Sequence, residues 1–265
     1  MAKDLMKKEQ AEFEMFDEGD SAGQDMDRED IVIPRLTILQ SNSPQTQKRE
    51  STYVEGCEPG MIFDVVNNVG FDGEDGVVIV PLNFRKTYIE WISREQGGGF
   101  VADHGNEVGK ALLADCTKDD TKDILPNGNQ LVRTLEYVCF QIKENGFYPT
   151  IISMASSQIK HGLRFNTQLS TYSLNAPDGQ RKPAPIYFRA WDFKTQPESN
   201  DKGSWFSWMI QAKCKITDLP GQVDWLKDPA DFIAECKEFR KLVQSDAIRF
   251  APPPAATTEG DSESY

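Results

Sequence analysis

The sequence lacks the features that define several large classes of protein. It contains no apolar run of 18 residues, and its first 20 residues carry too many charges for a secretory signal. Its five cysteines are scattered and never form a Cys-x-x-Cys pair, which argues against a zinc site and a disulfide framework. We therefore expect a soluble cytoplasmic protein with free thiols, no metal, no cofactor and no membrane partner.

Catalytic motifs are also scarce. Only two histidines are present, His104 and His161, and no G-x-S-x-G or H-E-x-x-H motif accompanies them. The stretch from Gly105 to Lys110 is one residue too short for a phosphate-binding loop and has no Ser or Thr after the lysine. A catalytic triad formed by residues that are distant in the sequence stays an open alternative at this point. The sequence favours a protein that is not an enzyme.

The net charge of −13 is unevenly distributed. Residues 1–30 hold four Lys/Arg against eleven Asp/Glu, and residues 251–265 hold three acidic residues and no basic one, so residues 31–250 carry only −3. Within that body, residues 133–215 hold eleven Lys/Arg against six Asp/Glu, together with 13 of the 27 aromatic residues. A basic, ring-rich segment between acidic ends indicates a local footprint for a polyanion.

Most of the body is predicted to form strands. The run from Val77 to Trp91 reads as one long strand with a bulge at Pro81, and residues 131–154 read as a hairpin that turns at Asn145-Gly146. A helix is expected to start at Ser156, and a second, amphipathic helix at Asp224 or Asp228. The pattern predicts a mainly β fold with α additions, namely one middle and one C-terminal helix.

The segment from Tyr187 to Lys215 combines rings and cations in two strand-like runs joined by a turn-rich loop at residues 197–203. Period-two alternation places alternate residues of the first run on one face: Tyr187, Arg189, Trp191 and Phe193. In the second run the core-facing set is expected to be Phe206, Trp208, Ile210 and Ala212. Taken singly, each ring fits a core position better than a binding position, but rings beside Arg and Lys are what a single-stranded nucleic acid requires.

An ordered set of motifs through the body resembles phage-encoded single-stranded DNA-binding proteins. The set comprises Ile33–Gln40 with Ser43-Pro44, then Pro59-Gly60, Tyr88–Trp91 with Gly97–Gly99, the helix from Ser156 to Asn166, the ring-rich hairpin, and an acidic tail that ends in an aromatic residue. The resemblance implies an elaborated OB-like β-barrel that coats single-stranded DNA during phage replication or recombination. It divides the chain into a largely flexible acidic arm at 1–30, a binding domain at 31–250 and a flexible acidic tail at 251–265.

Binding residues follow from this interpretation. Bases are expected to stack on some of five rings: Tyr88, Trp91, Trp191, Phe193 and Trp205. Phosphates are expected to meet six cations: Arg85, Lys86, Lys160, Arg164, Arg189 and Lys213. In the tail, Asp261, Glu263 and Tyr265 are the residues expected to recruit replication or recombination proteins, and an oligomer is compatible with the sequence. The alternative is a phage structural or assembly protein that binds no nucleic acid.

Overall fold

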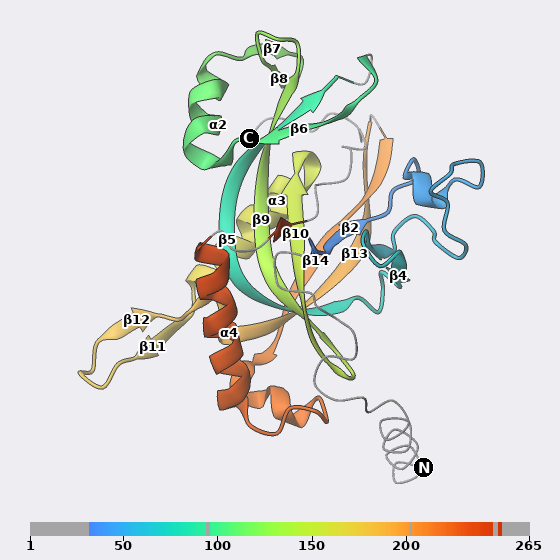
Figure 1. Ribbon diagram of the computed structural model, residues 1–265. Coiled ribbons are helices and arrows are strands. Elements are labelled where there is room, and N and C mark those ends of the chain that lie inside the picture. The colour runs from blue at the N-terminus through green and yellow to red at the C-terminus, as the bar shows by residue number, and fades with distance from the viewer. Residues whose placement is uncertain (1–31, 94–95, 202, 246–248, 251–265) are drawn as a thin grey trace, which may run out of the picture. The chain divides into compact units, whose positions relative to one another are not determined.

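The structure is a computed structural model that describes residues 32–93, 96–201, 203–245 and 249–250 (Figure 1). Within these residues the chain is mainly β-strand, with α-helices at Gly105–Ala114 (α2), Ile159–Ser170 (α3) and Pro229–Gln244 (α4). The predicted fold class, mainly β with helical additions, is therefore confirmed. The predicted acidic arm at 1–30 and the acidic tail at 251–265 lie outside the described residues. Among the helices described, none has the length and apolar character that a membrane span requires.

The main sheet holds eleven strands of the described chain. Its neighbours run antiparallel, apart from one parallel pair, β10 with β2. The order along the sheet is β14 (Gly203–Lys215), β13 (Arg189–Asn200), β5 (Val77–Ile92), β9 (Gln130–Lys143), β10 (Gly146–Ala155), β2 (Arg35–Ile38), β3 (Ile62–Asp64) and β4 (Val69–Phe71). Three further strands join the sheet outside this order: β6 (Gly99–Asp103) pairs with β5, β8 (Lys122–Ile124) pairs with β9, and β7 (Thr117–Asp119) pairs with β8.

Shorter elements complete the described chain. Two ribbons stand apart from the main sheet: β1 (Val32–Ile33) with β15 (Arg249–Phe250), and β11 (Ser173–Asn175) with β12 (Arg181–Pro183). The 3-10 turns are η1 (Pro44–Thr46), η3 (Ser156–Gln158), η4 (Ile186–Phe188) and η5 (Ile216–Gly221). Between β6 and β9 the chain forms α2, β7 and β8.

Several local predictions match the structure. The hairpin of β9 and β10 turns just before Gly146, and both strands are central in the sheet. The register of β5 against β9 shifts between Pro81 and Asn83, where the bulge was predicted. A 3-10 turn, η3, starts at Ser156, where a helix was predicted, and it runs directly into α3. The α-helix itself starts three residues later, and its N-cap is Gln158.

The sheet curls so that its β14 edge approaches β2, and glutamine side chains bridge the gap. Gln40 follows β2; its amide accepts a hydrogen bond from Phe206 N and donates one to Phe206 O, each at 2.8 Å. Gln158 donates to Phe206 O at 3.1 Å and accepts from Trp208 N at 3.2 Å. These amides supply the partners that another strand would give to this part of β14. We call this arrangement the glutamine seam.

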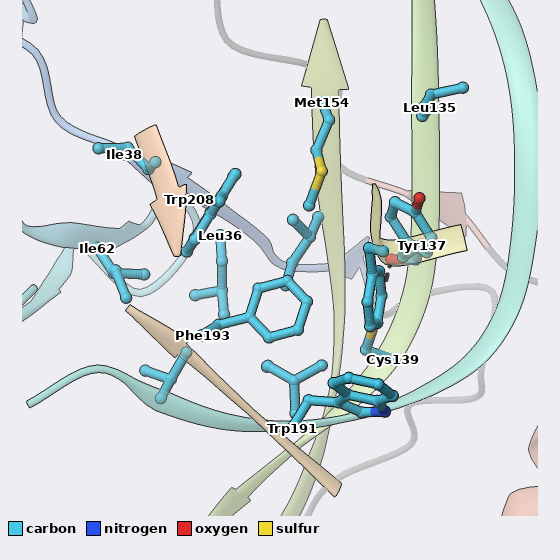
Figure 2. Close-up of a cluster of buried hydrophobic side chains, with 14 residues drawn as sticks. Leu36, Ile38, Ile62, Leu135, Tyr137, Cys139, Met154, Trp191, Phe193 and Trp208 are labelled. Carbon is cyan, nitrogen blue, oxygen red and sulfur yellow. Dashed lines mark hydrogen bonds between the residues drawn. The ribbon is translucent and has the colours of Figure 1, made fainter. Parts of the chain in front are cut away.

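The interior of the curled sheet is a continuous apolar core (Figure 2). Trp191, Phe193 and Trp208 from the β13–β14 hairpin meet Tyr137 and Cys139 of β9 in this core. The Phe165 ring of α3 closes over it, with centroids 5.1 Å from Tyr137, 5.0 Å from Trp191 and 5.4 Å from Phe193. Successive side chains of a strand alternate between faces, so Phe140 and Ile142 of β9 point to the opposite face, where α4 and η5 pack.

Candidate functional site

The five rings predicted to stack on bases lie in the core. The exposed fraction is 1% for Trp191 and 0% for Phe193, and it is below 9% for Tyr88, Trp91 and Trp205. Trp191 and Phe193 share one face of β13, as predicted, and this face points into the sheet interior. Tyr187 was predicted on the same face, but it lies in η4 and packs against the opposite cluster, so that part of the prediction is wrong. Stacking needs an accessible ring face. We therefore assign these rings to packing.

The other three rings are held by specific neighbours. Tyr88 lies under α2, where a Cβ at Gly109 would collide with its ring, so glycine permits the close approach. Trp91 meets Phe100 edge to face, with centroids 5.9 Å apart. The indole Nε1 of Trp205 donates to the Ser207 hydroxyl at 2.9 Å.

Four of the six predicted phosphate-binding cations contact other side chains. Arg85 pairs with Glu136 and Asp103, Lys160 pairs with Glu198, and Lys213 pairs with Asp192. The guanidinium of Arg189 lies 5.0 Å from the Tyr172 ring centroid. Lys86 and Arg164 show no ion pair within the described residues. The proposed role of these cations as phosphate ligands stays a prediction.

A polar cluster around Glu198 joins α3 to the β13–β14 hairpin. The Glu198 carboxylate lies 2.8 Å from Lys160 Nζ and 3.2 Å from His161 Nε2, and it accepts a hydrogen bond from Ser207 Oγ at 2.9 Å. Ser207 and His161 each contact the Glu198 carboxylate. A catalytic triad requires the serine to contact the histidine, so this cluster does not have the arrangement of a triad. The cluster fixes α3 to the sheet.

Glu198 also makes stability depend on pH. Burial alone raises the pKa of Glu198, but hydrogen bonds from Lys160 and Ser207 and the nearby positive charges outweigh burial and lower the pKa to about 2. Because the folded pKa is lower than the ordinary 4.5, this contribution is complete above pH 4.5 and disappears as the pH falls to about 2. We expect Glu198→Gln to lower the free energy of unfolding by about 1–3 kcal/mol at pH 7, and the difference from wild type should shrink between pH 4.5 and 2.

Urea unfolding at a series of pH values measures this difference. Glu238→Gln is the matched control, because Glu238 is 65% exposed and pairs with Lys241 on the surface. This control should follow wild type at every pH. A pH-independent deficit in Glu198→Gln would contradict the prediction.

A second charged cluster crosses the sheet from β2 to β6. Arg35 Nη1 lies 2.8 Å from Glu136 Oε1, Arg85 Nε donates to Glu136 Oε2 at 2.7 Å, and Arg85 Nη2 lies 2.8 Å from Asp103 Oδ2. The side chains of Arg35 and Glu136 are 2% and 1% exposed. At the other end of the cluster, the side chains of Arg85 and Asp103 are 37% and 26% exposed and pair with each other.

The chain does present a cationic groove, formed along α4. Asp228 starts the helix: its side chain accepts a hydrogen bond from Ala230 N at 2.8 Å, and Pro229 occupies the first turn. Phe232 and Cys236 are buried against the sheet, which confirms that the helix is amphipathic. The opposite stripe of the helix therefore faces outward: Ala230, Ala234, Lys237, Lys241 and Gln244.

Between this stripe and Tyr187 of η4 lies a cavity of about 440 Å³, which we call the α4 groove. The small side chains of Ala230 and Ala234 leave the groove open. Its lining includes three cations, Lys237, Arg240 and Lys241, and one carboxylate, that of Glu238. Lys241 and Glu238 form an exposed pair at 2.7 Å. The buried Arg240 Nε makes no hydrogen bond within the described residues. The groove is thus locally positive in a chain of net charge −13.

The sequence alone did not reveal the α4 groove. The outward spacing of Ala230, Ala234, Lys237 and Lys241 is visible in the sequence, yet the same spacing is typical of any solvated helix face. Tyr187 reaches the groove from a distant segment, so no local pattern connects the two. Across the described ranges, His, Cys, Asp and Glu side chains do not gather in groups of three or more that could hold a metal ion.

A curled sheet with a cationic groove on an added helix defines the class: a mainly β protein with a candidate anion-binding surface. The chain matches the family of Pam3 phage gp34-like proteins over residues 5–249, and it belongs to this family. It is therefore a phage protein. No curated protein and no solved structure gives a significant match.

Proposed function

We propose that this phage protein binds single-stranded DNA through the α4 groove and coats it during replication or recombination. The observation that carries the proposal is the combination of three cations and a tyrosine ring in one cavity. Single-stranded nucleic acid is held by such a combination, because phosphates meet cations while bases stack on rings. The proposal places the contacts on residues other than the buried rings predicted from the sequence.

The groove explains how an acidic chain attracts a polyanion. Surface charges more than about 10 Å apart are largely screened at 0.1 M salt, so Lys237, Arg240 and Lys241 act locally on a strand in the groove. Sequence preference should be weak, because every base has a π-face that can stack on Tyr187. We also propose that the protein acts by binding and not by catalysis, and that the acidic tail recruits other replication or recombination proteins.

Reversing two groove charges tests the proposal. The double variant Lys237→Glu with Lys241→Glu should lower affinity for a labelled single-stranded oligonucleotide at least about tenfold. The plot of log affinity against log salt should become shallower by about 1.4, since each phosphate contact on a single strand contributes about 0.7. Fluorescence anisotropy across a salt series gives both quantities.

The matched control reverses two lysines elsewhere. Lys110 and Lys118 are 48% and 65% exposed, and each pairs with one carboxylate, as Lys241 does. Lys110→Glu with Lys118→Glu changes the net charge by the same amount and should bind within about twofold of wild type. Equal losses in both double variants would show that net charge, and not the α4 groove, governs binding.

The Tyr187 ring gives a second readout. Tyr187→Leu keeps apolar contact with the core beneath it and removes the stacking face, so we expect a loss of about 1–3 kcal/mol in binding. Tyr187→Phe keeps the ring and should bind like wild type. If wild type shows no salt-dependent binding, the alternative of a phage structural or assembly protein is favoured. Cleavage of the oligonucleotide in the presence of Mg²⁺ would indicate an enzyme.

A further inference from the structure

We propose that the β11–β12 ribbon is an arm that holds the DNA strand where it leaves the α4 groove, an inference that rests on the proposed function. Figure 1 shows this ribbon extending outward from the body. Its strands pair only with each other, through Ser173 with Pro183, Leu174 with Lys182 and Asn175 with Arg181. The ribbon is therefore a separate structural unit within the described residues.

The ribbon has little core of its own. All three β12 residues are exposed, and Leu174 on β11 is 43% exposed. An isolated two-stranded hairpin is marginally stable in water. Turn bonds hold its tip, where Ala176 N donates to Gln180 O at 2.8 Å and Gly179 N donates to Ala176 O at 2.9 Å. An ordered but unburied ribbon is suited to contact with a partner.

The base of the ribbon connects it to the α4 groove. Ala184 N donates to Tyr172 O at 2.9 Å, and the Tyr172 ring lies 6.0 Å from the Phe188 ring and 5.0 Å from the Arg189 guanidinium. The chain leaves β12 at Pro183 and reaches Tyr187, a wall of the groove, four residues later. The arm and the groove wall are thus one continuous segment.

The charges of the ribbon fit phosphates. Arg181 and Lys182 are both exposed, and neighbouring positions of a strand point to opposite faces, so each face of the ribbon presents one cation. The acidic group at the tip is Asp178, 3.7 Å from Lys182 and 51% exposed. Arg181 Nε donates to the Ser173 hydroxyl, which orients the guanidinium. A strand that lies in the groove and continues past Tyr187 meets these cations next.

Oligonucleotides of two lengths distinguish binding at the arm from binding at the α4 groove. A short probe of about 4 nucleotides fills the groove alone, whereas a probe of about 16 nucleotides also reaches the ribbon. Arg181→Glu with Lys182→Glu should bind the short probe like wild type and the long probe about tenfold more weakly. Lys237→Glu with Lys241→Glu should weaken both probes. The Lys110→Glu with Lys118→Glu control should weaken neither, and circular dichroism verifies that each variant is folded.

Limited proteolysis supplies an independent readout on the wild-type chain. Trypsin can cleave after Arg181 but not after Lys182, because Pro183 follows Lys182. The long probe should slow the cleavage after Arg181, while the short probe should not. If wild type binds both probes but the ribbon variant binds the long probe equally well, the arm is refuted and the proposed function stands. If wild type binds neither probe, the proposed function fails and the arm fails with it. A ribbon variant that loses only self-association in sedimentation would identify a second copy of the chain as the partner and would also refute the arm.

Discussion

Trp191→Ala should lower the free energy of unfolding by about 3–5 kcal/mol, the usual cost of removing a large buried aromatic side chain. Trp191 is 1% exposed and packs edge to face with Phe165 at 5.0 Å and with Tyr172 at 6.1 Å. Its removal leaves a cavity that links α3 to the sheet interior. Urea unfolding followed by circular dichroism measures the change.

Trp191→Phe is the matched control. The indole Nε1 is buried without a hydrogen-bond partner in the described residues, so phenylalanine removes an unsatisfied donor as well as some volume. These effects oppose each other, and we expect a change below about 1.5 kcal/mol. A folded Trp191→Ala variant of wild-type stability that fails to bind DNA would contradict the core assignment and restore the surface stacking predicted from the sequence.

Glu136→Gln should have an effect of similar size, about 3 kcal/mol or more, because it breaks a buried ion pair and leaves charge behind. Glu136 accepts hydrogen bonds from Arg35 and from Ser153, each at 2.8 Å, and one from Arg85 at 2.7 Å. Glutamine keeps the shape but removes the negative charge that compensates Arg35. Thermal and urea unfolding of the single variant test this expectation.

A variant that replaces both Arg35 and Glu136 separates the cost of breaking this ion pair from the contribution of the pair itself to stability. Arg35→Met with Glu136→Leu replaces the pair with apolar side chains, and such replacements are often neutral or stabilising. Arg85 keeps Asp103 as its partner in this variant, at 2.8 Å. The double variant should therefore be more stable than Glu136→Gln. A double variant that is less stable than the single one would show that the ion pair itself stabilises the fold.

Local sequence patterns were sufficient to predict many elements of this fold. Asn145-Gly146 identified the β9–β10 hairpin because this pair suits a tight turn, and Pro81 identified the bulge in β5 because proline cannot donate to a strand neighbour. Asp228 and the inward spacing of Phe232 and Cys236 identified α4. These signals act over a few residues, so they survive in a single sequence.

The binding surface was not predictable in the same way. Both faces of the sheet are covered, one by α3 and the other by α4 and η5, so the alternation along β13 does not reveal which face meets solvent. The sequence around Arg189 and Trp191 shows the same alternation whether the Trp191 ring lies in the core or on the surface. The α4 groove depends on Tyr187 approaching a helix that is distant in the sequence, and Arg35 meets Glu136 across 101 positions.

The glutamine seam covers part of the outer edge of β14. An uncovered outer strand is a template on which further chains can add and grow into fibrils. At Phe206 and Trp208, any incoming chain must first displace amides that already occupy the main-chain donors and acceptor. Two neutral side chains thus occupy the backbone groups to which a further strand would have to bind.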